Sequence, residues 1–193
     1  MARTRILDID SAIETATQLF WRNGYERTSL SDLTQAMGIT PPSFYFAFGN
    51  KEGLFKQVLA RYSQTRLGYA EQALALPKVR DGVETMLSRL AALYSDPDYP
   101  PGCLALNNAL PCVKSNEPMR EEFAEMRAAR RARLCARLEQ AKVEGDLPAN
   151  EHCESLARYI MTVGWGMAID AQSGATREDL LRTVANTMKA WPV

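Results

Sequence analysis

The sequence predicts an all-α protein, and two observations support this prediction. Apolar residues recur at the three- and four-residue spacing of a helix in almost every segment, and no segment shows the alternation of a strand. Glycine, proline and capping residues divide these segments into about nine helices. Because the first three helices fall within about fifty residues, we expect a small N-terminal domain at residues 1–60 and a larger helical domain at residues 61–193.

The first two helices have clear signals at their ends. Residues 9–20 place their apolar side chains on one face, and Gly24 suits the left-handed backbone position that follows a helix. Ser29 and Asp32 have the spacing of a capping box at the start of a short second helix. Gly38 is expected to end that helix.

The third helix is also short, and the fourth is long. Thr40 can cap the third helix, with Pro41 at its first position, where a missing N–H does no harm. The fourth helix is expected to begin at Lys51 and to continue until Pro77 stops it. The boundary between the two domains falls within this helix, so we expect a shared helix and not a flexible linker.

The second domain continues with helical segments of different lengths. Residues 83–93 predict a helix that ends in the proline-rich loop at residues 95–102. A short helix is expected from Cys103, and Asn116 can cap a longer helix that runs to Gly145. Its periodic apolar residues predict one face packed in the core.

Two further helices are expected near the end of the chain. Asn150 can cap the first of them, which reaches Ser173. Thr176 and Asp179 repeat the capping-box spacing and predict the start of the last helix.

Composition describes an ordinary folded protein. Of the 193 residues, 46% are hydrophobic and 24% are charged. No stretch has the apolar core of a signal peptide, and no apolar run approaches the ~20 residues that span a bilayer. We therefore expect a soluble, cytoplasmic protein.

Cysteine, histidine and charge narrow the possible functions. The four cysteines lack a C-x-x-C pair, which predicts reduced thiols, and a single histidine excludes a histidine-rich metal site. We expect no cofactor. The 23 basic and 23 acidic residues balance, which by itself argues against a nucleic-acid partner.

The second and third helices nevertheless have the arrangement of a helix-turn-helix. Gly38 permits the tight turn between them, and Leu33, Phe44 and Phe48 are expected to fill the space where they meet. The third helix of such a motif can place its N-terminal residues in the major groove of DNA. Most of the acidic residues of this domain lie at the first helix or at Glu26, away from the third helix.

The motif belongs to a longer pattern with fixed spacing, between about residue 6 and residue 60. Its members are Leu19, Phe20, Gly24, Tyr25, Thr28, Ser29, Asp32, Leu33, Ala36–Ile39, Phe44, Tyr45, Phe48 and Lys51–Leu54. This pattern resembles the DNA-binding domain of the TetR family of transcriptional regulators. Nineteen matched positions make it far more specific than a lone helix-turn-helix.

The resemblance implies individual DNA contacts. A hydroxyl or an ammonium group suits a phosphate oxygen, and the expected phosphate contacts are Thr28, Tyr45 and Lys51. A proline offers apolar surface to a thymine methyl, and a hydroxyl can bond a base edge. The expected base-edge contacts are Thr40, Pro42 and Ser43.

The sequence departs from the family pattern at the end of the third helix. Many members have histidine or another polar residue where this chain has Ala47, so one common phosphate contact is absent. Phe46 is bulky for an exposed position and is expected to pack against sugar or base edges. Arg3 and Arg5 either follow the backbone or minor groove of DNA or form a solvated terminus.

For the chain as a whole, the resemblance implies a ligand-responsive repressor. It would bind a palindromic operator in double-stranded DNA as a homodimer and be released by a small-molecule effector. Two-fold symmetry is needed because two recognition helices must lie about one turn of DNA apart. The expected dimer interface on the last two helices comprises Leu156, Ile160, Val163, Gly164, Ala168, Leu180, Leu181, Val184 and Met188.

The effector is expected inside the second domain, among aromatic, methionine and polar residues. Each of these residues has an alternative role in the core, and a buried amide needs a partner that a ligand can supply. Such a pocket suits a small apolar or aromatic molecule. The expected pocket residues are Tyr62, Tyr69, Met86, Tyr94, Cys103, Asn107, Met126, Tyr159, Met161 and Trp165.

Cys103 has a second interpretation. Residues 102–104, Gly-Cys-Leu, resemble a segment found in a subset of TetR regulators, some of which sense electrophiles or oxidants through this cysteine. A cysteine at a helix N-terminus has more thiolate, whereas a buried thiol in a short core helix is inert. A helical thiol sensor, with or without DNA release, is therefore the alternative function.

Two other classes fit less well. An enzyme needs a nucleophile–base pair, a metal cluster or a phosphate loop, and none is recognisable; His152 lies at a helix start, where capping or exposure explains it. The arginines of residues 120–137 go around their helix, with glutamates at pairing distance, which predicts a salt-bridged surface and not a second DNA site.

Overall fold

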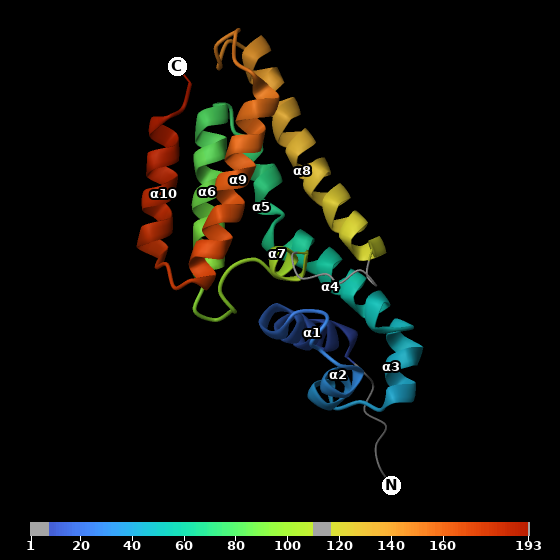
Figure 1. The fold of residues 1–193 in the computed structure, drawn as a ribbon. Helices are drawn as coiled ribbons and strands as arrows, with labels where there is room; N and C mark the ends of the chain where they lie inside the picture. Colours follow the sequence, from blue (N-terminus) through green and yellow to red (C-terminus); the bar gives the residue numbers. More distant parts are fainter. Residues whose placement is uncertain (1–7, 110–116, 193) are drawn as a thin grey trace. The chain divides into compact units, whose positions relative to one another are not determined.

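The computed structural model of the chain describes residues 8–109 and 117–192 (Figure 1). These residues form ten helices and no strand. The all-α prediction is confirmed. Contacts divide the chain into two units, Met1–Arg66 and Leu67–Val193, and the boundary falls at the end of a helix.

The first unit has an aromatic core. Phe20 and Phe55 meet edge to face with 4.9 Å between ring centroids, and Trp21 meets Tyr62 in the same way at 5.2 Å. Such pairs add to the free energy gained by burying the rings. The core is enclosed by α1 (Ile9–Asn23), α2 (Leu30–Met37), α3 (Pro41–Phe48) and α4 (Lys51–Arg66).

Local capping sets the starts of the short helices, as the sequence predicts. The Ser29 hydroxyl accepts from the Asp32 N–H at 3.1 Å, and the Asp32 carboxylate accepts from the Ser29 N–H at 2.8 Å. Thr40 caps α3 in front of Pro41. These bonds satisfy N–H groups that have no partner inside the helix.

The second unit contains six helices. In Figure 1, α6, α9 and α10 run side by side, and α8 lies along α9. The short α5 packs on α6, where a Cβ added to Gly82 would lie 2.6 Å from the Ala73 carbonyl oxygen. The helices are α5 (Tyr69–Leu74), α6 (Val79–Tyr94), α7 (Leu104–Ala109), α8 (Glu117–Val143), α9 (Cys153–Gln172) and α10 (Arg177–Lys189).

Two helix boundaries differ from the sequence-based expectation. The long fourth helix ends at Arg66, and α5 begins separately at Tyr69 because the chain turns at Leu67, which is buried. The cap of α9 is His152, whose Nδ1 accepts from the Ser155 N–H at 3.2 Å, and not Asn150. Asn116, the expected cap of α8, lies outside the described residues.

The proline-rich loop after α6 depends on Gly102. Its φ is +85°, which side chains rarely adopt, and an added Cβ would lie 2.7 Å from the Ala168 carbonyl oxygen of α9. The loop therefore approaches α9 as closely as a glycine permits. Among the helices described, none combines the length and apolar composition that a membrane span requires.

Candidate nucleic-acid interface

The turn between α2 and α3 is held entirely by the backbone. Gly38 has φ 65° and ψ 34°, its N–H donates to the Gln35 carbonyl at 3.2 Å, and the Ile39 N–H donates to the Thr34 carbonyl at 3.0 Å. This hydrogen-bond pair ends a helix sharply and suits a glycine in the left-handed region. The turn leaves Thr40 three residues after the end of α2, ready to start α3.

The first turn of α3 presents hydroxyl and proline surface. Thr40, Pro42 and Ser43 are all exposed. The Thr40 hydroxyl accepts from the Ser43 N–H at 3.4 Å and shares a hydrogen bond with the Ser43 hydroxyl at 3.0 Å. The two hydroxyls therefore sit together at the head of the helix, where the expected base-edge contacts lie.

The rest of α3 separates core from surface. Phe44 and Phe48 are buried, as predicted, and their rings are 5.4 Å apart. Tyr45 is 52% exposed and meets Phe44 edge to face at 5.9 Å. The contact with Phe44 orients the Tyr45 ring. Its phenol group remains exposed.

Lys51 begins α4 and is fixed by a neighbouring ring. Its Nζ lies 4.2 Å from the centroid of Tyr25, a cation–π distance. Partial burial lowers the pKa of Lys51, while the nearby charge of Glu26 raises it. The spacing of residues gives no hint of this ring contact, because Tyr25 and Lys51 belong to different segments of the chain.

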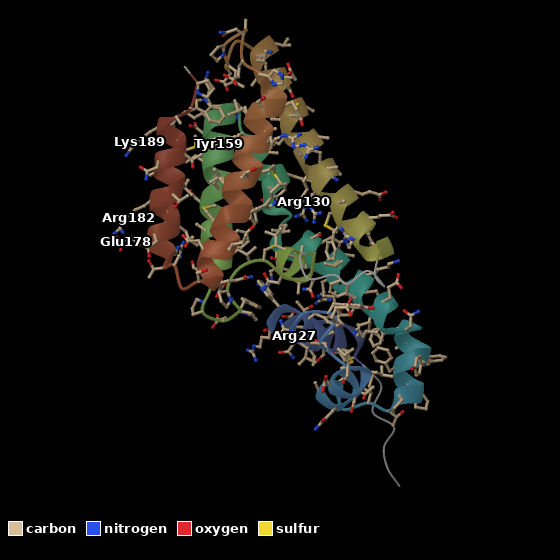
Figure 2. The ribbon with its side chains drawn as sticks, viewed as in Figure 1. Arg27, Arg130, Tyr159, Glu178, Arg182 and Lys189 are labelled. Carbon is tan, nitrogen blue, oxygen red and sulfur yellow. The ribbon has the colours of Figure 1, made fainter. Side chains whose placement is uncertain are left out.

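Thr28 does not fit the expected phosphate contact. Its side chain is 0% exposed, and its hydroxyl donates to the Gly24 carbonyl at 2.8 Å. Thr28 therefore stabilises the turn between α1 and α2. Arg27, labelled in Figure 2, is the exposed cation next to it in the chain and was not among the predicted contacts.

Comparisons with known proteins decide what kind of motif this is. Residues 12–58 match the family described as "Bacterial regulatory proteins, tetR family", and residues 75–188 match "Tetracyclin repressor-like, C-terminal domain". The chain belongs to the TetR family. Together the two matches cover most of the chain, so this TetR-family protein is a transcriptional regulator, a role that is not enzymatic.

Individual relatives agree over nearly the full length. The HTH-type transcriptional repressor ComR of Escherichia coli K12 is 31% identical over 192 residues, which is 98% of this chain and 91% of ComR. CifR, solved as a cysteine mutant complexed with 26-base-pair double-strand operator DNA, has a TM-score of 0.93 and 37% identity, covering 98% of this chain and all of that one. Reduced Escherichia coli NemR, with a TM-score of 0.81, 20% identity and 96% of each chain covered, shares the fold.

Eight of the ten residues expected in an effector pocket lie inside the second unit, and two do not. Tyr62 lies in the first unit, in the core against Trp21, and Tyr159 is exposed on α9 (Figure 2). The others lie in the second unit with little exposure. Met86, Tyr94 and Cys103 are buried there, and Tyr69, Asn107, Met126, Met161 and Trp165 are half-buried.

Tyr69, Tyr94 and Cys103 lie close together, beside Arg130. Burial raises the pKa of Tyr94, neighbouring Cys103 and Tyr69 raise it further, and the charge of Arg130 lowers it. Burial also raises the pKa of Tyr69, with a further contribution from Cys103. The Tyr69 hydroxyl is buried and has no hydrogen-bond partner within the described parts of the chain. Arg130 (Figure 2), expected on a salt-bridged surface, was not predicted to lie here.

Asn107 is not the buried amide that the sequence predicted. Asn107 is half-buried, and its Oδ1 accepts a hydrogen bond from Gln172 of α9. The buried amide is Asn108, which is 2% exposed and donates to the Leu104 carbonyl at 2.7 Å. Both amides are thus used to attach or stabilise α7.

The residues expected at a dimer interface lie mostly in the core of their own unit. Gly164 faces α6, since an added Cβ would lie 3.3 Å from Leu90 Cδ1. Leu156 and Val163 are half-buried, and Leu181 is 38% exposed. The buried ones are Ile160, Gly164, Ala168, Leu180, Val184 and Met188.

The same two helices carry a different apolar surface. Tyr159 and Ile169 of α9 are 46% and 50% exposed, and Leu181 of α10 is also accessible. Gly166 is exposed, and an added Cβ would meet nothing within 4 Å. We call Tyr159, Gly166, Ile169 and Leu181 the α9–α10 surface. Of the residues that periodicity selected for an interface, Leu181 belongs to this surface, whereas most of the others pack inward.

Proposed function

We propose that this TetR-family regulator is a repressor that binds a palindromic operator in double-stranded DNA. The observation that carries the proposal is α3, a short helix with an exposed hydroxyl-bearing first turn, entered through the sharp turn at Gly38. A helix of this kind can enter the major groove with its N-terminal residues forward. The operator complex of CifR and the repressor name of ComR support the proposal.

The proposed contacts follow from exposure. Thr40, Pro42 and Ser43 would face base edges, because they form the exposed first turn of α3. Tyr45 and Lys51 would bind phosphates through a phenol group and an ammonium group. Thr28 is left out because its hydroxyl already has a partner and no exposure. Arg3 and Arg5 lie outside the described residues.

A gel shift with the DNA that flanks its own gene tests the proposal. Specific binding should survive competition by unrelated duplex at physiological salt, because base contacts add to the phosphate contacts that every sequence offers. The absence of binding even at low salt, where phosphate contacts are strongest, would contradict the proposal.

The repressor is proposed to act as a homodimer through the α9–α10 surface. Exposed apolar side chains on two adjacent helices provide an area that a second copy can cover, and two-fold symmetry makes the patch self-complementary. Sedimentation of the purified chain measures its oligomeric state directly. A monomer at micromolar concentration would contradict it.

Release by a small-molecule effector is the third part of the proposal. The buried Tyr69 hydroxyl without a described partner, together with Arg130, favours an apolar or aromatic effector that carries an acceptor oxygen. Effector binding would favour a conformation in which the two recognition helices no longer match the operator, with α4 as the moving element. In a thermal-shift screen, Tyr69→Phe should weaken the response to compounds with such an oxygen but not to purely apolar ones.

A thiol sensor acting through Cys103 is the alternative. CifR was solved as a cysteine mutant, which favours a test of this residue. Cys103 is only 3% exposed, so we expect slow alkylation of the native protein and rapid alkylation after unfolding. Peptide mapping would decide: fast, selective modification of native Cys103 that also releases DNA would establish the sensor in place of a bound effector.

A further inference from the structure

Phe46 of α3 buries almost no apolar surface and therefore does not stabilise the fold. Its side chain is 96% exposed, the highest value among the large apolar residues that the structure describes as exposed. The neighbours Phe44 and Phe48 are buried and already fill the core side of the helix. A fully exposed ring on a helix proposed to bind DNA therefore points to an intermolecular role.

The chemistry of α3 restricts what that role can be. The helix has the sequence Pro-Pro-Ser-Phe-Tyr-Phe-Ala-Phe, without a charged or amide side chain. Arginine, lysine, asparagine and glutamine make the paired hydrogen bonds that identify guanine and adenine in the major groove, and α3 has none of them. The Thr40 and Ser43 hydroxyls at its start already share a hydrogen bond and cap the helix, so each offers a base edge only a single hydrogen bond, which does not distinguish one base from another.

One base feature remains that an apolar helix can recognise. The C5 methyl of thymine projects into the major groove and is the only methyl group that the four bases present there. Pro42 and Phe46 are four residues apart and therefore lie on one face of the helix. Both are exposed, so together they form an apolar strip that continues from the first turn of α3.

We propose that Phe46 determines sequence specificity by packing against thymine methyl groups in the major groove. The inference rests on the proposed function, since it requires α3 to enter that groove. A ring on a methyl buries apolar surface from both partners, and losing one methyl corresponds to about a 4-fold loss of affinity. The preferred half-site should then contain thymine at one or two fixed positions opposite α3.

Deoxyuridine provides the probe. Wild-type protein selects duplexes from a random-sequence library, and each thymine of the selected site is then replaced by deoxyuridine, which pairs in the same way and lacks only the methyl. We expect a loss of about 4-fold at one or two positions per half-site and no change elsewhere. Phe46→Ala should bind the thymine duplex more weakly and show no further loss at those positions.

A matched variant controls for the removal of an exposed apolar side chain. Val143, at the end of α8, is 90% exposed, and Val143→Ala should keep the full dependence on the thymine methyls. Because Phe46 lies almost entirely in solvent, Phe46→Ala should melt at the wild-type temperature, which circular dichroism verifies.

The possible outcomes separate the inference from the proposed function. Failure of the wild-type protein to enrich any site overturns both. A selected site that binds equally well with uracil throughout overturns the role of Phe46 alone. Weaker binding by Phe46→Ala with an unchanged thymine-to-uracil ratio would place the ring on sugar and phosphate, or identify a role outside DNA, and also overturns it.

Discussion

At the residue scale, the DNA contact that can be tested most directly is Lys51. Its ammonium group is held over the Tyr25 ring at 4.2 Å, so little side-chain freedom is left to lose on binding. A phosphate contact acts on every sequence alike. Lys51→Ala should weaken specific and non-specific binding together and reduce the slope of log affinity against log salt by about 1.

Lys189→Ala is the matched control, because Lys189 is exposed on α10 of the other unit (Figure 2). It should leave affinity and salt slope unchanged. Wild-type affinity in Lys51→Ala at physiological salt would show that the phosphate contacts have been assigned to the wrong residues.

Gly102 and Gly166 give opposite predictions for the same substitution. Gly102→Ala combines a φ of +85° with an approach of 2.7 Å to the Ala168 carbonyl oxygen, so we expect a loss of about 1–3 kcal/mol in the free energy of unfolding. Gly166→Ala adds a helical methyl that meets nothing within 4 Å in its own chain, so the fold of the single chain should be unchanged or stabilised by up to about 1 kcal/mol. Urea denaturation of both variants measures the difference. Equal stabilities would contradict the close approach at Gly102.

At the scale of the element, the helix-turn-helix depends on its caps. The Ser29 hydroxyl accepts from the Asp32 N–H at the start of α2. Ser29→Ala should lower the free energy of unfolding by about 0.5–2 kcal/mol. Ser31→Ala removes the same hydroxyl two residues later, from an exposed helical position, and should change stability by less than about 0.5 kcal/mol. Similar losses in the two variants would show that the cap contributes little.

The same capping box makes α2 sensitive to acid. Side-chain and backbone hydrogen bonds from Ser29 lower the pKa of Asp32, so the carboxylate binds its proton less readily in the folded state than in the unfolded chain. Its stabilisation is complete above the unfolded pKa of about 3.9 and is lost as the pH falls through the folded value. The stability difference between wild type and Asp32→Asn should therefore shrink from pH 6 to pH 3 in urea titrations. Asp170→Asn, at an exposed position on α9, is the control, and a difference that is constant with pH would exclude the cap as its origin.

At the scale of the whole molecule, we propose that operator binding depends on dimerisation through the α9–α10 surface. Leu181 is 38% exposed, so Leu181→Glu should preserve the fold while placing a charge in an apolar interface, where it is poorly solvated. Sedimentation velocity should show a monomer, and operator binding should fall because one half-site contributes alone. Val143→Glu, equally drastic but on α8 outside that surface, should remain dimeric. A dimeric Leu181→Glu protein would assign the interface to another surface.

Much of this architecture could be predicted from local patterns. Capping boxes predicted the starts of α2 and α10, and Thr40 followed by Pro41 predicted the start of α3, because a cap bonds within its own first turn and needs no distant partner. The buried Leu33, Phe44 and Phe48 followed from the spacing of the helix-turn-helix. The matched spacing between about residue 6 and residue 60 also identified the family.

At several other positions, burial and neighbours were decided only by the tertiary structure. The sequence alone determined an all-α regulator and the capped starts of α2, α3 and α10, since a cap depends on residues within one turn of each other. The fold decided that Thr28 turns inward, that Asn107 bonds Gln172, and that Gly164 faces α6. A helical pattern shows which face of a helix is apolar. Only packing in three dimensions decides which neighbour covers each residue on that face.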